Sequence, residues 1–200
     1  MARKKLTEVT TAGVEGSISP AGEQFALPRK EEYGKEFRRV EKLAARARAE
    51  GKEVVVVMGV GFVGAVMAAI IADTEDEKGN PCKFVIGCQR PSSRSYWKIP
   101  LLNRGQSPIK AEDPEVDGLI TRCVLEKKTL IATYNSDCLA LADCVVVDVQ
   151  CDYRKHTLGN MRSGETDMAA LEATMRTIGE KIEPSCLVLI ETTVAPGTTE

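Results

Sequence analysis

Three glycines occur at turn spacing in the sequence Gly59-Val60-Gly61-Phe62-Val63-Gly64, between the apolar run 54–57 and the apolar segment 65–72. A first glycine permits a tight turn, a second lets the backbone approach a phosphate without a Cβ, and a third lets a helix pack closely on a strand. The N-terminus of a following helix would direct unpaired N–H groups at an anion. The spacing predicts that these six residues hold the pyrophosphate of a dinucleotide.

The end of the next apolar run bears on which dinucleotide is bound. Sites for NAD usually place an acidic residue there, where it accepts hydrogen bonds from the adenosine ribose. This chain has Gln89, followed by Arg90 and, four residues later, Arg94. Without the carboxylate a 2′-phosphate is not repelled, and the arginines could pair with it. NADP is therefore open beside NAD, for which Gln89 would bind the 2′-hydroxyl and the arginines would be solvated or stack on adenine.

The elements that must position these residues alternate as a parallel sheet requires. Apolar β-type runs occupy residues 54–57, 84–88, 129–133, 144–149 and 186–190. Helical patterns separate most of them, at 116–127, 136–142 and 166–182, and the polar segment 73–81 lengthens one connection. This order predicts an α/β fold with five parallel strands, a Rossmann-type doubly wound sheet that forms one dinucleotide-binding domain over residues 51–200.

Residues 1–50 are expected to form an N-terminal extension. Residues 1–30 show little periodicity and predict a loose or peripherally packed arm with little chemistry. Residues 31–50 are rich in helix formers and predict an amphipathic helix on the domain edge. Its apolar stripe consists of Tyr33, Phe37, Val40, Leu43 and Ala44.

Composition argues against several classes of function. The formal net charge of -2 provides no basic field for nucleic acid. Seven scattered cysteines indicate reduced, mostly buried thiols, and His156 is the only histidine, so no ligand set for structural zinc is expected. The first residues lack the apolar core of a secretory signal, which favours the cytoplasm. The apolar stretch 54–72 has the length of a membrane span, but a strand, a glycine turn and a buried helix explain it better.

Four segments, in order, resemble the UDP-glucose and GDP-mannose 6-dehydrogenase family. The sequence Glu191-Thr192-Thr193-Val194-Ala195-Pro196-Gly197-Thr198-Thr199-Glu200 is similar to the family's "STVPPGTTE" segment. The glycine run is similar to its "GlGyVG", residues 102–109 to its "iNxGxxPi" and residues 142–147 to its "ADvvfi". Asp167 matches the aspartate that opens the family's long helix. The resemblance covers residues 53–200.

The resemblance implies an activity for the parent enzyme. Family members oxidise the C6 hydroxyl of a nucleotide-linked hexose to a carboxylate in two hydride transfers, with NAD as the cofactor. By position, Thr192 and Val194 would lie near the nicotinamide, as would Gln150 and Cys151 after the fourth strand. Thr193 matches the threonine that helps to position the water or hydroxyl near the reacting carbon, and its hydroxyl can both donate and accept. Its alternative role is a turn residue that bonds nearby backbone.

The chain also departs from the family pattern. Cys151-Asp152 stands where the family has Thr-Pro, and Gln89 replaces the acid. The family's nucleophilic cysteine, and the lysine and asparagine that stabilise its oxyanion, lie beyond the threonine turn and are absent from this sequence. Cys151 could substitute only with a base such as His156, and an inert thiol is the simpler interpretation. We therefore expect no catalysis by these 200 residues alone, and homo-oligomers only for a full-length enzyme.

Two other functions remain open. One is the N-terminal domain of another β-hydroxy acid dehydrogenase, such as the 6-phosphogluconate group, against which Thr192-Thr193 with Pro196-Gly197 argues. The other is a non-catalytic module that senses a nucleotide and binds a partner protein.

Overall fold

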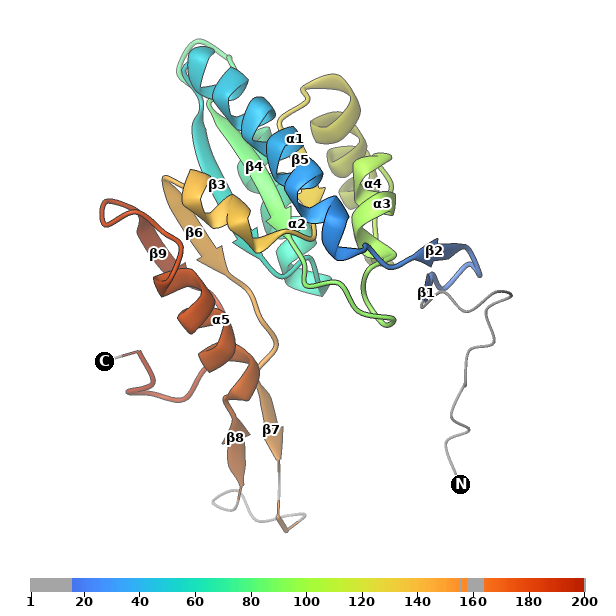
Figure 1. Ribbon diagram of the computed structural model, residues 1–200, viewed down its shortest axis with the longest axis vertical. Helices are drawn as coiled ribbons and strands as arrows, with labels where there is room; N and C mark the ends of the chain where they lie inside the picture. Colours follow the sequence, from blue (N-terminus) through green and yellow to red (C-terminus); the bar gives the residue numbers. More distant parts are fainter. Residues whose placement is uncertain (1–15, 155, 158–163, 200) are drawn as a thin grey trace.

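The computed structural model describes residues 16–154, 156–157 and 164–199, and a five-stranded parallel sheet forms its centre (Figure 1). The strands are β3 (Glu53–Met58), β4 (Lys83–Cys88), β5 (Leu130–Thr133), β6 (Cys144–Val147) and β9 (Leu187–Ile190). Their order in the sheet is β5-β4-β3-β6-β9. The chain steps outward from β3 to β5 and then returns to β6 on the other side of β3, which is the doubly wound arrangement. The predicted Rossmann-type α/β fold with five parallel strands is confirmed.

One face of the sheet is covered by α2 (Phe62–Asp73), α3 (Lys98–Asn103), α4 (Glu115–Thr121) and the π-helical turn η1 (Arg122–Glu126). The predicted helix over 116–127 is thus an α-helix that widens into a π turn. The β-branched run of β3 is buried because helices cover both of its faces, as parallel sheets require. Among the described residues no helix is long and apolar enough to cross a membrane, and the stretch 54–72 is divided between β3 and α2.

The other face is covered by α1 (Lys30–Ala49), the 3-10 turn η2 (Ser136–Leu141) and α5 (Ala169–Gly179). The connection from β5 to β6 contains no α-helix, only the six-residue turn η2, and α1 lies across β3 and β4 beside it (Figure 1). Val40 and Ala44 of α1 belong to the same buried cluster as Val56 and Ile86. The predicted amphipathic helix is present as α1, but it packs on the face of the sheet and not at the domain edge.

Of the two alternatives for the N-terminal arm, loose or peripherally packed, residues from 16 onward follow the second, because β1 (Gly16–Ile18) and β2 (Gln24–Ala26) form an antiparallel hairpin in which Ser17 is fully buried. One prediction needs correction. The helix predicted over 166–182 is shorter, because Thr166 pairs with Tyr153 in a hairpin of β7 (Asp152–Arg154) and β8 (Glu165–Asp167). This hairpin projects from the sheet in Figure 1. Residues 1–15 of the predicted arm lie outside the described residues.

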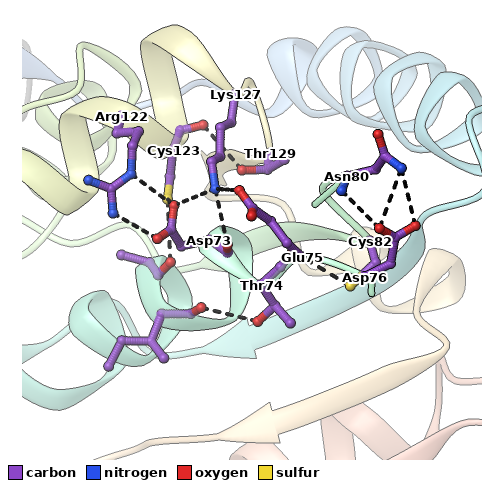
Figure 2. Close-up of polar contacts among 12 residues, drawn as sticks. Asp73, Thr74, Glu75, Asp76, Asn80, Cys82, Arg122, Cys123, Lys127 and Thr129 are labelled. Carbon is purple, nitrogen blue, oxygen red and sulfur yellow. Dashed lines mark hydrogen bonds and ion pairs between the residues drawn. The ribbon is translucent and has the colours of Figure 1, made fainter. Parts of the chain in front are cut away.

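The polar connection between α2 and β4 is ordered by its own side chains (Figure 2). Asp73, the last residue of α2, accepts hydrogen bonds from Arg122 Nε at 3.0 Å and Nη2 at 2.7 Å. Lys127 Nζ lies 2.9 Å from the same carboxylate and 2.6 Å from Glu75. Further along, Asp76 Oδ1 accepts the backbone N–H groups of residues 78 and 80. The inserted segment is therefore tied to the π turn η1.

Candidate functional site

The glycine turn leaves β3 in a conformation that other residues would not adopt. Gly59 has a φ of +101°, and a Cβ there would lie 2.3 Å from the carbonyl oxygen of Asp148. A Cβ at Gly64 would lie 1.8 Å from the carbonyl oxygen of Gly59. Both glycines are required by close backbone packing inside the protein. At Gly61, by contrast, a Cβ would have no atom within 4 Å, so this position faces open space.

The open space lies at the start of α2. Gly61 is the N-cap of this 12-residue helix, and no side chain caps the first N–H groups. Phe62 and Val63, the first helical residues, are 67% and 53% exposed. Uncapped N–H groups and the positive end of the helix dipole form an anion site that needs no charged side chain. A cradle that a Cβ would fill, at a helix N-terminus, fits the pyrophosphate of NAD.

The glycine turn lies where the winding of the sheet reverses. The chain leaves β3 toward β4 on one side, and β6 pairs with β3 on the other. Ligands of doubly wound sheets bind outside the carboxyl ends of the strands at this switch point. The carboxyl ends of β4, β6 and β9 bring three more segments to the same edge, beginning at Gln89, Asp148 and Glu191.

Gln89 contacts the glycine turn directly. Its Oε1 accepts the N–H of Val60 at 3.1 Å, and its backbone N–H donates to the carbonyl of Thr133 at 3.0 Å. The residue at the predicted ribose position therefore also fixes the glycine turn. Arg90 and Arg94 are exposed, and the carbonyl of Arg94 accepts the indole N–H of Trp97 at 3.0 Å.

Asp148 belongs to the site although the sequence pattern placed it within the fourth strand. Its carbonyl packs on Gly59, and its Oδ2 would lie 2.9 Å from a Cβ at Gly64. Burial raises the pKa of this carboxyl group, and the nearby charge of Glu191 raises it further. The apolar run before Asp148 gave no signal of this contact, because the contact joins the ends of two strands that are far apart in sequence.

The threonine turn after β9 is bonded to the end of β6. Thr192 Oγ1 accepts the N–H of Val149 at 3.0 Å and lies 2.9 Å from the carbonyl oxygen of the same residue. The backbone-bonding role considered for Thr193 thus belongs to Thr192, while Thr193 is exposed and Val194 is half-buried. The turn is held beside Gln150, which is also exposed.

Cys151 and His156 contact different residues and not each other. Its half-buried thiol lies 3.6 Å from the carbonyl of Asp167 and 3.5 Å from the sulfur of Met168, at the start of α5. His156 Nε2 instead lies 3.4 Å from Glu165. Within the described ranges, no three His, Cys, Asp or Glu side chains are grouped to hold a metal ion.

The comparisons with known proteins decide the family. The family model described as "UDP-glucose/GDP-mannose dehydrogenase family, NAD binding domain" matches residues 53–200. The chain belongs to this family. The expected resemblance is confirmed, and NAD is the cofactor that the family domain binds. A comparison with curated proteins found no match.

Solved structures of nucleotide-sugar dehydrogenases resemble this family member. An NDP-N-acetyl-D-galactosaminuronic acid dehydrogenase from Methanosarcina mazei Go1 is 32% identical, with a TM-score of 0.62 over 80% of this chain and 31% of its own. A GDP-mannose dehydrogenase from Pseudomonas aeruginosa is 27% identical, with a TM-score of 0.57 over 72% of this chain and 29% of its own. A UDP-D-ManNAc dehydrogenase from Pyrococcus horikoshii is 26% identical, with a TM-score of 0.55 over 73% and 30%. The chain thus spans about a third of the length of the structures it matches.

Proposed function

We propose that this chain is the NAD-binding part of an enzyme that oxidises the C6 hydroxyl of a UDP- or GDP-linked hexose to a uronate. The observation that carries the proposal is the open face of Gly61 at the uncapped start of α2, in a chain of this family. NAD supplies the hydride acceptor. A bound nucleotide sugar would meet the nicotinamide near the threonine turn, on the side of β6 and β9.

The binding roles follow from the position of each segment at the carboxyl edge. Backbone N–H groups of the glycine turn bind the pyrophosphate, and the loop after β4 lies along the adenosine ribose. Proposed cofactor contacts are Gly59, Val60, Gly61, Phe62, Val63, Gly64, Gln89, Arg90, Arg94, Gln150, Cys151, Thr192 and Val194. The exposed hydroxyl of Thr193 orients the reacting hydroxyl or water, because it can donate and accept without carrying charge.

Turnover requires more than this chain contributes. Hydride transfer needs a substrate held against the nicotinamide, and the chain spans only about a third of the length of the matched structures. We propose that the residues described here bind NAD without oxidising a sugar, and that the complete enzyme is a homo-oligomer. All seven thiols are free, which suits a reducing compartment such as the cytoplasm.

Paired calorimetric titrations with NAD and NADP test the cofactor part. We expect tighter binding of NAD than of NADP, and an Arg90→Gln/Arg94→Gln double variant should keep that preference. Tighter binding of NADP, lost in the double variant, would assign the arginines to a 2′-phosphate and contradict the proposal. Absence of any binding would overturn it.

The encoding transcript tests the enzymatic part. A reading frame that continues into a substrate-binding domain with a cysteine nucleophile supports the dehydrogenase. A stop codon directly after Glu200 would instead support the nucleotide-sensing module.

A further inference from the structure

The N-terminal hairpin of β1 and β2 contacts the loop that joins β4 to α3. This loop, residues 89–97, starts at Gln89 and carries both exposed arginines at the adenosine end of the proposed cofactor site. The hairpin lies beside it in Figure 1, and residues 16–26 lie outside the matched family domain. The contact therefore joins a segment outside the matched family domain to a loop inside it.

Ser17 makes the contact. Its side chain is fully buried, its Oγ donates to the carbonyl of Ser93 at 2.8 Å, and the same oxygen accepts the N–H of Trp97 at 3.2 Å. Trp97 is the N-cap residue of α3, so its N–H is one that the helix itself does not satisfy. One hydroxyl from the extension thus bonds two backbone groups in the second half of the loop.

The loop is fixed at both ends. At its start, Gln89 bonds the N–H of Val60 in the glycine turn. Within it, Ser95 Oγ lies 3.1 Å from the carbonyl of Arg90 and 2.8 Å from Ser92 Oγ. These bonds lie within the loop and shape it. Among the described residues, the side-chain hydrogen bonds between the loop and the hairpin are those of Ser17.

The extension is also bound to the domain at places other than Ser17. Glu23 pairs with Arg104 at 2.6 Å, and the guanidinium of Arg104 lies 5.5 Å from the ring centroid of Phe25. On α1, the carbonyl of Tyr33 accepts a bond from Asn135 at 3.0 Å. Because these contacts are independent of the loop, removing one hydroxyl leaves the hairpin in place.

We infer that Ser17 is a positioning residue for the adenosine half of the cofactor: it holds the loop 89–97 in the shape that binds the adenosine ribose. The inference rests on the proposed site. It assigns the N-terminal extension a part in cofactor binding, through backbone geometry and without contact between Ser17 and the cofactor.

The test compares Ser17→Ala with Ser19→Ala in the same chain. Ser19 is also buried in the hairpin, but its Oγ accepts only the N–H of Glu23, within the hairpin turn. Titrations use NAD, ADP-ribose and nicotinamide mononucleotide, with thermal unfolding measured alongside. Ser17→Ala should weaken NAD and ADP-ribose binding about five- to tenfold, because the carbonyl of Ser93 and the buried N–H of Trp97 both lose their partner. Nicotinamide mononucleotide should bind both variants as it binds the unaltered chain.

The outcomes separate the inference from the proposed function. If the unaltered chain binds no NAD, both are overturned. If the unaltered chain binds NAD, and Ser17→Ala binds ADP-ribose as tightly as the unaltered chain does, only the inference is overturned. The inference is also overturned if Ser19→Ala weakens ADP-ribose binding as much as Ser17→Ala does. If Ser17→Ala does not fold, Ser17→Cys replaces it, because a thiol has a similar volume and is a weaker donor and acceptor. Weaker ADP-ribose binding by Ser17→Cys supports the inference, and unchanged binding overturns it.

Discussion

At the scale of single residues, the three glycines of the turn 59–64 are needed for different physical reasons. Gly59 and Gly64 are required by the protein itself, since a Cβ at either would overlap backbone oxygen. A Cβ at Gly61 would have no protein atom within 4 Å, so the lack of a side chain there is useful only to a ligand. A side chain at Gly64 should therefore lower the stability of the fold, whereas a side chain at Gly61 should weaken cofactor binding.

Gly64→Ala should lower the free energy of unfolding by about 3 kcal/mol, because the contact is with backbone that cannot move away. Gly61→Ala should unfold like the unaltered chain, since its φ of -82° suits alanine, yet bind NAD at least about tenfold more weakly. Urea unfolding and NAD titration of both variants measure the two effects. Unchanged NAD affinity in Gly61→Ala would contradict the pyrophosphate assignment.

At the scale of elements, the connection from α2 to β4 depends on one carboxylate. Hydrogen bonds from the Arg122 guanidinium, with Lys127 nearby, hold the pKa of Asp73 well below its ordinary value of 3.8 (Figure 2). A carboxyl group whose pKa is lowered on folding stabilises the folded state above its ordinary pKa. This stabilisation is lost as the pH falls below 3.8.

Asp73→Asn should lower the melting temperature at pH 7 by about 2–4 °C, and the difference from the unaltered chain should shrink below pH 3.8. Glu77→Gln, in the same connection and exposed, is the control and should change neither value. Thermal unfolding between pH 3 and pH 7 measures the effect. A difference that stays constant with pH would show that Asp73 acts by packing and not by charge.

At the scale of the whole molecule, the two helical layers bury most of the thiols. Cys88, Cys123, Cys138 and Cys144 are buried, and Cys82, Cys151 and Cys186 are half-buried. Burial raises the pKa of Cys123 to about 11, so little of its reactive thiolate forms at neutral pH. Reaction with a thiol reagent therefore reports the packing of the sheet and its covering helices.

With Ellman's reagent at pH 7.5, we expect the three half-buried thiols to react in the native chain. The four buried thiols should react only in denaturant, where all seven become accessible. Rapid reaction of a fourth thiol without denaturant would show that one helical layer opens readily.

The sequence by itself determined which segments form the parallel strands and where the glycine turn lies. Both depend on local signals: β-branched runs define buried parallel strands, and glycine spacing defines the turn between β3 and α2. The helix over 30–49 was readable because its apolar stripe repeats every three to four residues.

Only the tertiary structure decided which distant residues meet. The bond from Val60 to Gln89, the packing of Asp148 under Gly59 and the reach of Ser17 to Trp97 join segments with no mutual spacing in the sequence. The strand pairing of Thr166 likewise shortened a helix that its local pattern favoured. Local propensity determines what a segment can form, whereas contacts between strand ends and loops depend on how the sheet places them.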